Sequence, residues 1–224
     1  MKEIWQLHDV IVVGAGPAGN ITALRLSSEG YDVVVLDWRE KIGDKLCTGI
    51  IGNECIKLYT SNQTHVYREA HSAIIVSPSG RRHRIGMGKT EAYIINRVGF
   101  VSSIAQQASE AGTSYRLGER VVDIHCSKSM VTVQALFKDT TRTYNARAIV
   151  IASGFSSPLL EMVGLSKTDQ PFHMIGCQTS VLTDQLDHTE VYLGDNISPG
   201  SFGWLVPLSG SKALAGLVSR KKLN

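Results

Sequence analysis

Three glycines and one aspartate near the start of the chain have the spacing of a dinucleotide-binding turn. Gly14, Gly16 and Gly19 form a G-x-G-x-x-G pattern, and Asp37 ends the next apolar run. In such a turn the first glycine permits a tight bend, the second lets the backbone approach a pyrophosphate, and the third lets a helix pack closely on a strand. The carboxylate can then accept hydrogen bonds from a ribose diol.

The flanking elements are those that such a turn requires. Residues 9–13 form a short, mainly apolar run rich in β-branched residues, which is typical of a buried parallel strand. Residues 20–29 have helical apolar spacing and end at Gly30, and 31–36 form a second apolar run. Strand, turn, helix and strand together predict a βαβ unit whose helix N-terminus faces the phosphates. The cofactor-binding residues predicted here are Gly14, Gly16, Pro17, Ala18, Gly19, Asp37 and Trp38.

Length, charge and cysteine use limit the remaining possibilities. The 224 residues, 43% of them hydrophobic, can bury the core of one large domain or two small ones. A net charge of +3 gives no reason to expect nucleic acid. No apolar run approaches the roughly 18 residues that span a bilayer, and residues 1–8 lack a signal-peptide pattern, so we expect a cytoplasmic protein. The four cysteines lack zinc-ligand spacing, which predicts free thiols and no metal site.

The rest of the chain reads as an α/β protein with two sheets. A glycine-rich loop is predicted over 42–52, with an ordinary connection as the alternative to a loop against a flat cofactor ring. Helices are predicted over 54–59 and 98–111, and a third parallel strand over 113–117. The other predicted strands are a hairpin at 72–76 and 81–85, a meander at 120–125, 130–137 and 141–145, a buried strand at 146–154, and an antiparallel sheet at 174–182, 190–193, 203–206 and 212–218.

Three further features each have two interpretations. The basic run at 81–84 is a solvated face, or it contacts a phosphate or an anionic membrane surface. Arg97 at a helix start binds an anionic cofactor group, or it forms a surface ion pair. The aromatic residues of segment 198–207 belong to the core, or they line an apolar substrate cavity.

The order of these motifs resembles the flavoproteins of the para-hydroxybenzoate-hydroxylase superfamily, and two segments resemble the geranylgeranyl reductases within it. Lys45-Leu46-Cys47-Thr48-Gly49 is similar to a lysine-x-cysteine-glycine loop of that family. The segment 199–207, PGSFGWLVP, with Ala215-Gly216 further on, is similar to its PG-x-(Tyr/Phe)-x-Trp-x-Phe-Pro signature and later glycine. The resemblance extends from about residue 9 to residue 218.

The resemblance implies a domain plan and a fuller set of site residues. An FAD-binding Rossmann-like domain, a parallel sheet with a β-meander, would cover 1–70 and 91–160. A partial antiparallel β substrate domain would cover 71–90 and 161–224. The cofactor-binding set is extended by Lys45, Cys47, Thr48, Gly49, Arg97, Val121 and Gly154, and Phe202 and Trp204 are assigned to the substrate.

By the same resemblance, flavin N5 would deliver a hydride to an isoprenoid carbon–carbon double bond. The chain would orient the alkene, and Cys47 would be the proton donor or a packing contact. The partners implied are a geranylgeranyl lipid or prenyl substrate, met peripherally at a membrane, and an electron donor such as NAD(P)H or ferredoxin. The alternatives are a flavin-dependent monooxygenase or halogenase, and a truncated, inactive dinucleotide-binding remnant.

Three departures from the family pattern bear on these expectations. Val206 stands where the signature has phenylalanine, and Ser153-Gly154 stands where many members have Asp-Gly. The chain ends at Asn224, before the further sheet and the Gly-Asp segment that the resemblance would place next. The resemblance therefore implies a truncated product, a fragment, or a protein that has lost the reaction.

Overall fold

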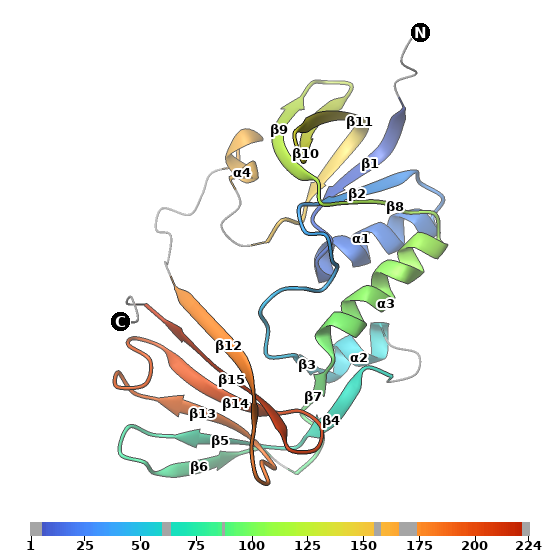
Figure 1. Cartoon of the computed structure of the whole chain (residues 1–224). Helices are drawn as coiled ribbons and strands as arrows, with labels where there is room; N and C mark the ends of the chain where they lie inside the picture. Colours follow the sequence, from blue (N-terminus) through green and yellow to red (C-terminus); the bar gives the residue numbers. More distant parts are fainter. Residues whose placement is uncertain (1–5, 60–63, 87, 155–157, 166–173, 221–224) are drawn as a thin grey trace. The chain divides into compact units, whose positions relative to one another are not determined.

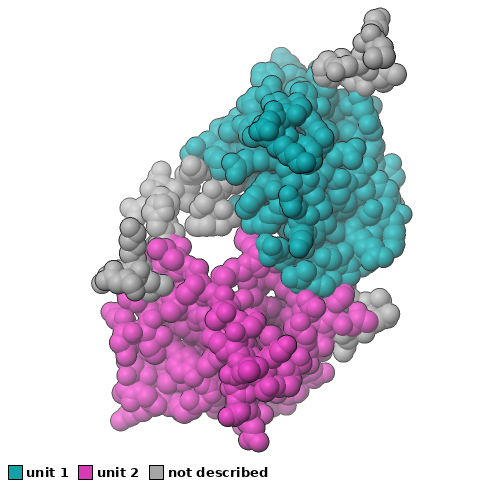
Figure 2. Space-filling model, in the orientation of Figure 1, with its two compact units in different colours: residues 1–44, 98–171 teal, residues 45–97, 172–224 magenta. Residues whose placement is uncertain are grey.

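The chain folds into two compact units (Figures 1 and 2). The computed structural model describes residues 6–59, 64–86, 88–154, 158–165 and 174–220. Unit 1 comprises 1–44 and 98–171, and unit 2 comprises 45–97 and 172–224. The chain thus changes unit after 44, 97 and 171, whereas the predicted domain boundaries follow 70, 90 and 160. Which unit binds which ligand stays a prediction.

Unit 1 is built on a six-stranded sheet of order β8-β2-β1-β11-β10-β9. Its parallel part contains β1 (Leu7–Val13), β2 (Val33–Asp37), β8 (Ser114–Leu117) and the end of β11 (Thr140–Ile151). Helix α1 (Pro17–Ser28) connects β1 to β2, and α3 (Arg97–Glu110) precedes β8. The predicted βαβ unit and third parallel strand are confirmed.

The predicted meander is confirmed, with one correction. Strands β9 (Arg120–Cys126) and β10 (Val131–Phe137) run antiparallel, and β10 pairs with the first half of β11. The separate strands predicted at 141–145 and 146–154 are one strand, because no turn residue interrupts them. Its second half pairs in parallel with β1. The predicted full burial of this half is wrong, since Arg147 and Ala148 are exposed.

The core of unit 1 lies on both faces of the parallel strands, which explains their continuous apolar runs. Successive side chains of a strand point to opposite faces. One face of β1 and β2 packs on the meander, through Ile11, Val13, Val34, Leu36, Val121, Ile124, Val131 and Val133. The other face packs on the helices, through Val10, Val12, Val33, Val35, Ala23 of α1 and Ala108 of α3.

Unit 2 contains a second six-stranded sheet of order β12-β15-β14-β13-β5-β6. Its strands are β5 (Ala73–Val76), β6 (Arg82–Ile85), β12 (Ile175–Leu182), β13 (Thr189–Leu193), β14 (Phe202–Pro207) and β15 (Lys212–Ser219). The predicted hairpin and the four later strands are confirmed. The pairing of β13 with β5 is parallel, so the prediction of a purely antiparallel sheet is wrong at this pair. Strands this far apart in sequence share no turn that would reveal their direction.

Unit 2 also holds a three-stranded sheet of order β3-β7-β4, with helix α2 (Asn53–Tyr59) after β3. These strands are β3 (Ile50–Gly52), β7 (Ala92–Ile95) and β4 (Val66–Ala70). The predicted loop over 42–52 therefore ends in a strand, and β4 was not predicted because its sequence is polar. A short helix, α4 (Leu159–Met162), lies in unit 1. In the described parts of the chain no helix is long and apolar enough to cross a membrane.

Candidate functional site

The glycine turn of unit 1 is packed so tightly that two of its positions have no room for a side chain. Gly14 has φ +112°, and a Cβ built there would lie 2.5 Å from the carbonyl oxygen of Ala152. A Cβ at Gly19 would lie 1.8 Å from the carbonyl oxygen of Gly14. These glycines let α1 approach the ends of β1 and β11, which supports two of the three roles predicted for the turn.

Gly16 differs, because a Cβ there would meet no protein atom within 4 Å. Packing within the chain thus gives no reason for glycine at this position. Gly16 is the N-cap of α1, and Pro17 occupies the first turn. No described side chain caps the turn and it contains no acidic residue, so its amides and the positive end of the helix dipole suit an anion. An open backbone at Gly16 beside these amides fits a pyrophosphate.

Asp37 is buried at the end of β2 and is tied to the same turn. One carboxylate oxygen accepts the backbone N–H of Ala15 at 2.7 Å, and the other accepts that of Arg39 at 2.8 Å. A carboxylate offers about four lone-pair positions, so these bonds leave acceptor capacity for ribose hydroxyls. Apart from its predicted contact with ribose, Asp37 therefore holds the glycine turn in place, which the sequence did not reveal.

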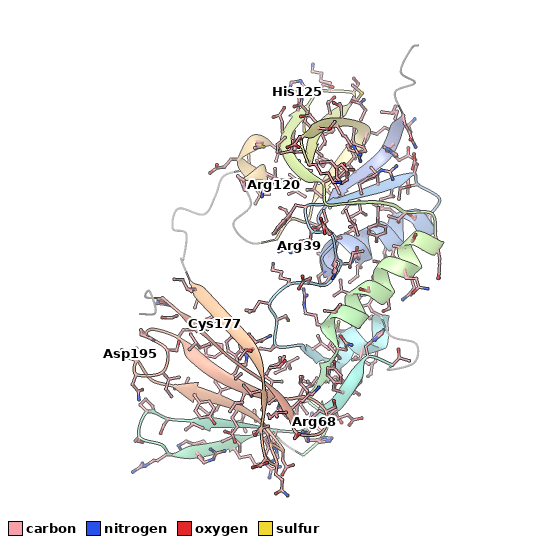
Figure 3. All side chains as sticks on the ribbon, viewed as in Figure 1. Arg39, Arg68, Arg120, His125, Cys177 and Asp195 are labelled. Carbon is pink, nitrogen blue, oxygen red and sulfur yellow. The ribbon has the colours of Figure 1, made fainter. Side chains whose placement is uncertain are left out.

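Two further predicted cofactor residues of unit 1 differ in exposure. Trp38 is 56% exposed, and the guanidinium of Arg39 stacks 4.3 Å from its ring centre. Figure 3 labels Arg39 just after β2. Val121 is buried in the core, so its side chain is not available for a ligand contact.

Gly154 follows β11 with φ +81° and is exposed. The preceding Ala152 donates its N–H to Val13 at 2.8 Å, next to the glycine turn. The structure therefore gathers Gly14–Gly19, Asp37 and the turn at Gly154 at the carboxyl ends of β1, β2 and β11. Ligands of open α/β sheets bind at this edge.

The predicted loop of unit 2 is fixed to β7 and to the start of α3. Gly49 is buried with φ +72°, a Cβ there would lie 2.7 Å from the carbonyl oxygen of Ile95, and its own carbonyl accepts the Ile95 N–H at 2.9 Å. Arg97 donates to the carbonyl of Lys45 at 3.2 Å. Arg97 is thus joined to the loop by this bond, and its predicted contact with an anionic cofactor group stays a prediction.

Cys47 is an exposed residue of this loop, while Thr48 is half-buried. The sulfur accepts the N–H of Gly49 at 3.5 Å, a contact that leaves the S–H proton unused. All four cysteines are free, and burial raises the pKa of the Cys55 thiol.

The two aromatic residues of the β14 signature have different surroundings. Phe202 is 41% exposed, whereas Trp204 is 7% exposed and packs with Ile94 and Val206. The two rings are 6.0 Å apart and inclined by 57°. Trp204 is therefore mainly a core residue of unit 2, and Phe202 is the one that offers apolar surface. Their assignment to a substrate stays a prediction.

Trp204 takes part in a contact that the sequence analysis missed. It lies opposite Gly216 of β15, and Gly216 lies opposite Gln178 of β12. A Cβ at Gly216 would come within 2.5 Å of the indole ring. The ring crosses this glycine, and its N–H reaches the amide oxygen of Gln178 at 3.3 Å. The amide N–H of Gln178 donates to the Cys47 carbonyl at 3.0 Å. Only the register of three strands reveals this row, so no local signal identifies Gln178.

The basic run at 81–84 is exposed on β6. Arg82 pairs with Glu190, whose other oxygen accepts the Tyr192 hydroxyl. Arg84 donates to the Ser72 hydroxyl at 3.1 Å. The solvated alternative agrees with this exposure, and contact with a phosphate or membrane stays untested.

Comparison with known proteins agrees with the motif-based resemblance. The digeranylgeranylglycerophospholipid reductase of Methanosarcina mazei is 26% identical over 220 residues, which are 94% of this chain and 54% of that protein. A geranylgeranyl bacteriochlorophyll reductase-like protein of Thermoplasma acidophilum superposes with a TM-score of 0.84 at 22% identity, over 96% of this chain and 57% of that one. The chain thus spans about half the length of the curated relatives it matches.

The fold alone does not separate reductases from halogenases. The halogenase PltM, solved in complex with phloroglucinol and FAD, superposes with a TM-score of 0.72 at 14% identity, over 95% of this chain and 52% of that one. The family described as pyridine nucleotide-disulphide oxidoreductase matches residues 8–189. The predicted α/β fold and the similarity to geranylgeranyl reductases are confirmed, and the chain belongs to the pyridine nucleotide-disulphide oxidoreductase family.

Proposed function

We propose that this chain binds FAD through the glycine turn of unit 1. The observation that carries this proposal is the open backbone at Gly16, beside uncapped helix amides and the carboxylate of Asp37. The amides of Ala18 and Gly19 would hold the pyrophosphate, and Asp37 would accept the ribose hydroxyls. The ribose hydroxyls are hydrogen-bond donors that suit the Asp37 carboxylate, and the positive end of the helix dipole favours the negative charge of the phosphates.

We further propose that the chain is part of an enzyme that reduces carbon–carbon double bonds of an isoprenoid lipid. The support is the similarity to digeranylgeranylglycerophospholipid reductases together with the Lys45–Gly49 loop and the β14 signature. A bound flavin would supply the hydride chemistry. The residues of this chain would do the rest: Phe202 would contact the apolar chain, and the Cys47 thiol would donate the proton that accompanies hydride transfer.

The first experiment tests flavin binding without requiring turnover. The full chain is incubated with FAD, desalted and titrated, and the retained flavin is measured by its visible absorbance. We expect retained FAD in the parent chain. Asp37→Asn should weaken binding, because one carboxylate oxygen becomes an amide N–H₂ that cannot accept from ribose. Gln134→Leu, at an exposed position of β10, is the matched control. A parent chain that retains no FAD contradicts the binding proposal.

The second experiment tests the reaction. The FAD-loaded chain is reduced chemically under anaerobic conditions and mixed with a geranylgeranyl phospholipid, and the lipid mass is followed. Saturation of a double bond adds two hydrogens to that mass. Cys47→Ser should slow saturation per FAD-loaded chain, because a hydroxyl is a much weaker acid than a thiol. Oxygen-dependent hydroxylation or halogenation of a substrate, without saturation, would instead support the monooxygenase or halogenase alternative.

A further inference from the structure

We propose that Gln178 is a positioning residue that clamps the Cys47 loop to the aromatic signature of β14. A role of the Cys47 loop and the β14 signature in a reaction rests on the proposed function. The clamp itself rests only on contacts within unit 2. Gln178 bridges segments that are far apart in sequence, since its amide N–H donates to the Cys47 carbonyl at 3.0 Å and its amide oxygen accepts from Trp204 at 3.3 Å.

The partners of Gln178 define how its amide is oriented. A backbone carbonyl can only accept and an indole N–H can only donate. The amide must therefore turn its nitrogen to Cys47 and its oxygen to Trp204. Asparagine has the same groups on a shorter side chain, glutamate has no donor when ionised, and leucine has neither group. Of these, glutamine alone makes both bonds at this distance.

The Trp204 end of the clamp satisfies a buried indole N–H. The indole lies in the core of unit 2 beside Ile94 and Val206, and a buried indole N–H needs an acceptor. Gly216 makes the bond possible, because the ring passes over a position that has no side chain. The clamp is thus a row across β14, β15 and β12, with a side chain at each end and none in the middle.

The loop end of the clamp restrains an exposed segment. The loop is exposed from Asp44 to Cys47. Arg97 donates to the Lys45 carbonyl and Gln178 donates to the Cys47 carbonyl, and the Ile95 N–H bonds to the Gly49 carbonyl just after this stretch. The methyl group Cδ2 of Leu46 also lies near Gly176, the second residue of β12. Because Gln178 bonds to the carbonyl of the cysteine itself, it restrains the backbone that carries the thiol. Its neighbour Cys177, labelled in Figure 3, lies on the same edge strand.

Substitutions at this position separate the two ends of the clamp. Gln178→Leu should release both partners. Gln178→Glu at neutral pH should keep Trp204, since a carboxylate accepts from an indole N–H, and should release the loop, since two acceptors repel each other. A purely structural role in β12 predicts no such division. Ser180→Ala, an exposed position two residues along the same strand, is the control.

Two measurements on the full chain, without flavin or substrate, read the two ends. Hydrogen exchange of peptides covering 44–49 reports the loop. Fluorescence reports Trp204 in a chain that carries Trp5→Phe and Trp38→Phe. We expect about fivefold faster loop exchange in both variants, as loss of one hydrogen bond implies. We expect a shifted Trp204 emission in Gln178→Leu alone.

Unchanged loop exchange in both variants, or the same emission shift in both, would overturn the proposal. If Gln178→Leu does not fold, Gln178→Glu still tests it, because its two readouts must diverge. A chain that binds no FAD yet shows this divergence would contradict the proposed function and leave the clamp supported. A chain that binds FAD and reduces lipid but shows no divergence between the two readouts would support the proposed function and contradict the clamp.

Discussion

The two candidate sites of this molecule are assembled in opposite ways. In unit 1 the turn at Gly14–Gly19 and the carboxylate of Asp37 lie within one continuous βαβ segment and act largely through backbone groups. In unit 2 the corresponding contacts join Cys47, Gln178, Trp204 and Gly216 from a loop and three strands. A local site can be recognised as a pattern in the sequence, whereas a dispersed one depends on sheet register.

The difference also concerns what glycine does. Gly19 makes room for backbone, Gly16 leaves open space, and Gly216 makes room for an aromatic side chain. The same residue type thus serves backbone packing at Gly19 and side-chain packing at Gly216, and we propose that it serves binding at Gly16. Alanine at each position should separate these three roles, and the size of the effect should follow what the new Cβ meets.

The largest effect is expected from Gly19→Ala. The new Cβ would lie 1.8 Å from the Gly14 carbonyl oxygen, so helix and strand must separate. We expect a loss of about 3 kcal/mol or more in unfolding free energy, since overpacking of a rigid contact is costly. Urea unfolding followed by circular dichroism measures it. A variant as stable as the parent would contradict the tight turn.

Gly216→Ala should have the second largest effect, and in unit 2. Its Cβ would lie 2.5 Å from the indole of Trp204, which must move out of the core and away from Gln178. We expect about 1–3 kcal/mol of destabilisation by overpacking, with a shifted Trp204 emission. Gly52→Ala is the control, because a Cβ there meets nothing within 4 Å. Equal changes in unfolding free energy for Gly216→Ala and Gly52→Ala would argue against the packing of Trp204 over Gly216.

Gly16→Ala should weaken FAD binding and leave the stability of the fold nearly unchanged. Since no protein atom lies within 4 Å of the new Cβ, we expect a change in stability below about 0.5 kcal/mol. FAD should bind at least about tenfold more weakly, equivalent to about 1.4 kcal/mol, because the methyl group occupies the place of the pyrophosphate. Titration of the full chain with FAD measures this. Unweakened binding would remove the main support for the phosphate site.

The smallest effect concerns the pH dependence of unit 2. Burial tends to raise the pKa of Glu190, but hydrogen bonds from Tyr192 and Arg82 outweigh it and hold the pKa below its ordinary value. A carboxyl group whose pKa is lower in the folded state stabilises the fold at pH values above its unfolded-state pKa, about 4.3. This stabilisation is lost as the pH falls through the folded-state pKa.

The test of this pair is Glu190→Gln, measured by urea unfolding at several pH values. The difference in stability between parent and variant should be constant above about pH 5 and should shrink below the ordinary glutamate pKa of about 4.3. Because the pair is partly solvated, the difference should be smaller than the effects of the glycine substitutions. A difference that grows on acidification would show that the pair does not stabilise the fold.

The sequence by itself predicted most helices and strands of unit 1. Apolar runs, glycine spacing and the acidic strand end are local signals, and they predicted β1, α1, β2, the third parallel strand and the meander. The predictions were wrong or incomplete at three places. The parallel contact of β13 with β5 is a non-local pairing, β11 continues because no turn residue interrupts it, and β4 has a polar sequence.

Only the tertiary structure decided how the second site is put together. Gln178 is an ordinary polar strand residue until register places it opposite Gly216, whose other neighbour across the sheet is Trp204. The same holds for Asp37, whose bond to the Ala15 amide appears only once the turn has closed. A side chain's partner across a sheet depends on pairing between distant strands, and no spacing within a single strand records that pairing.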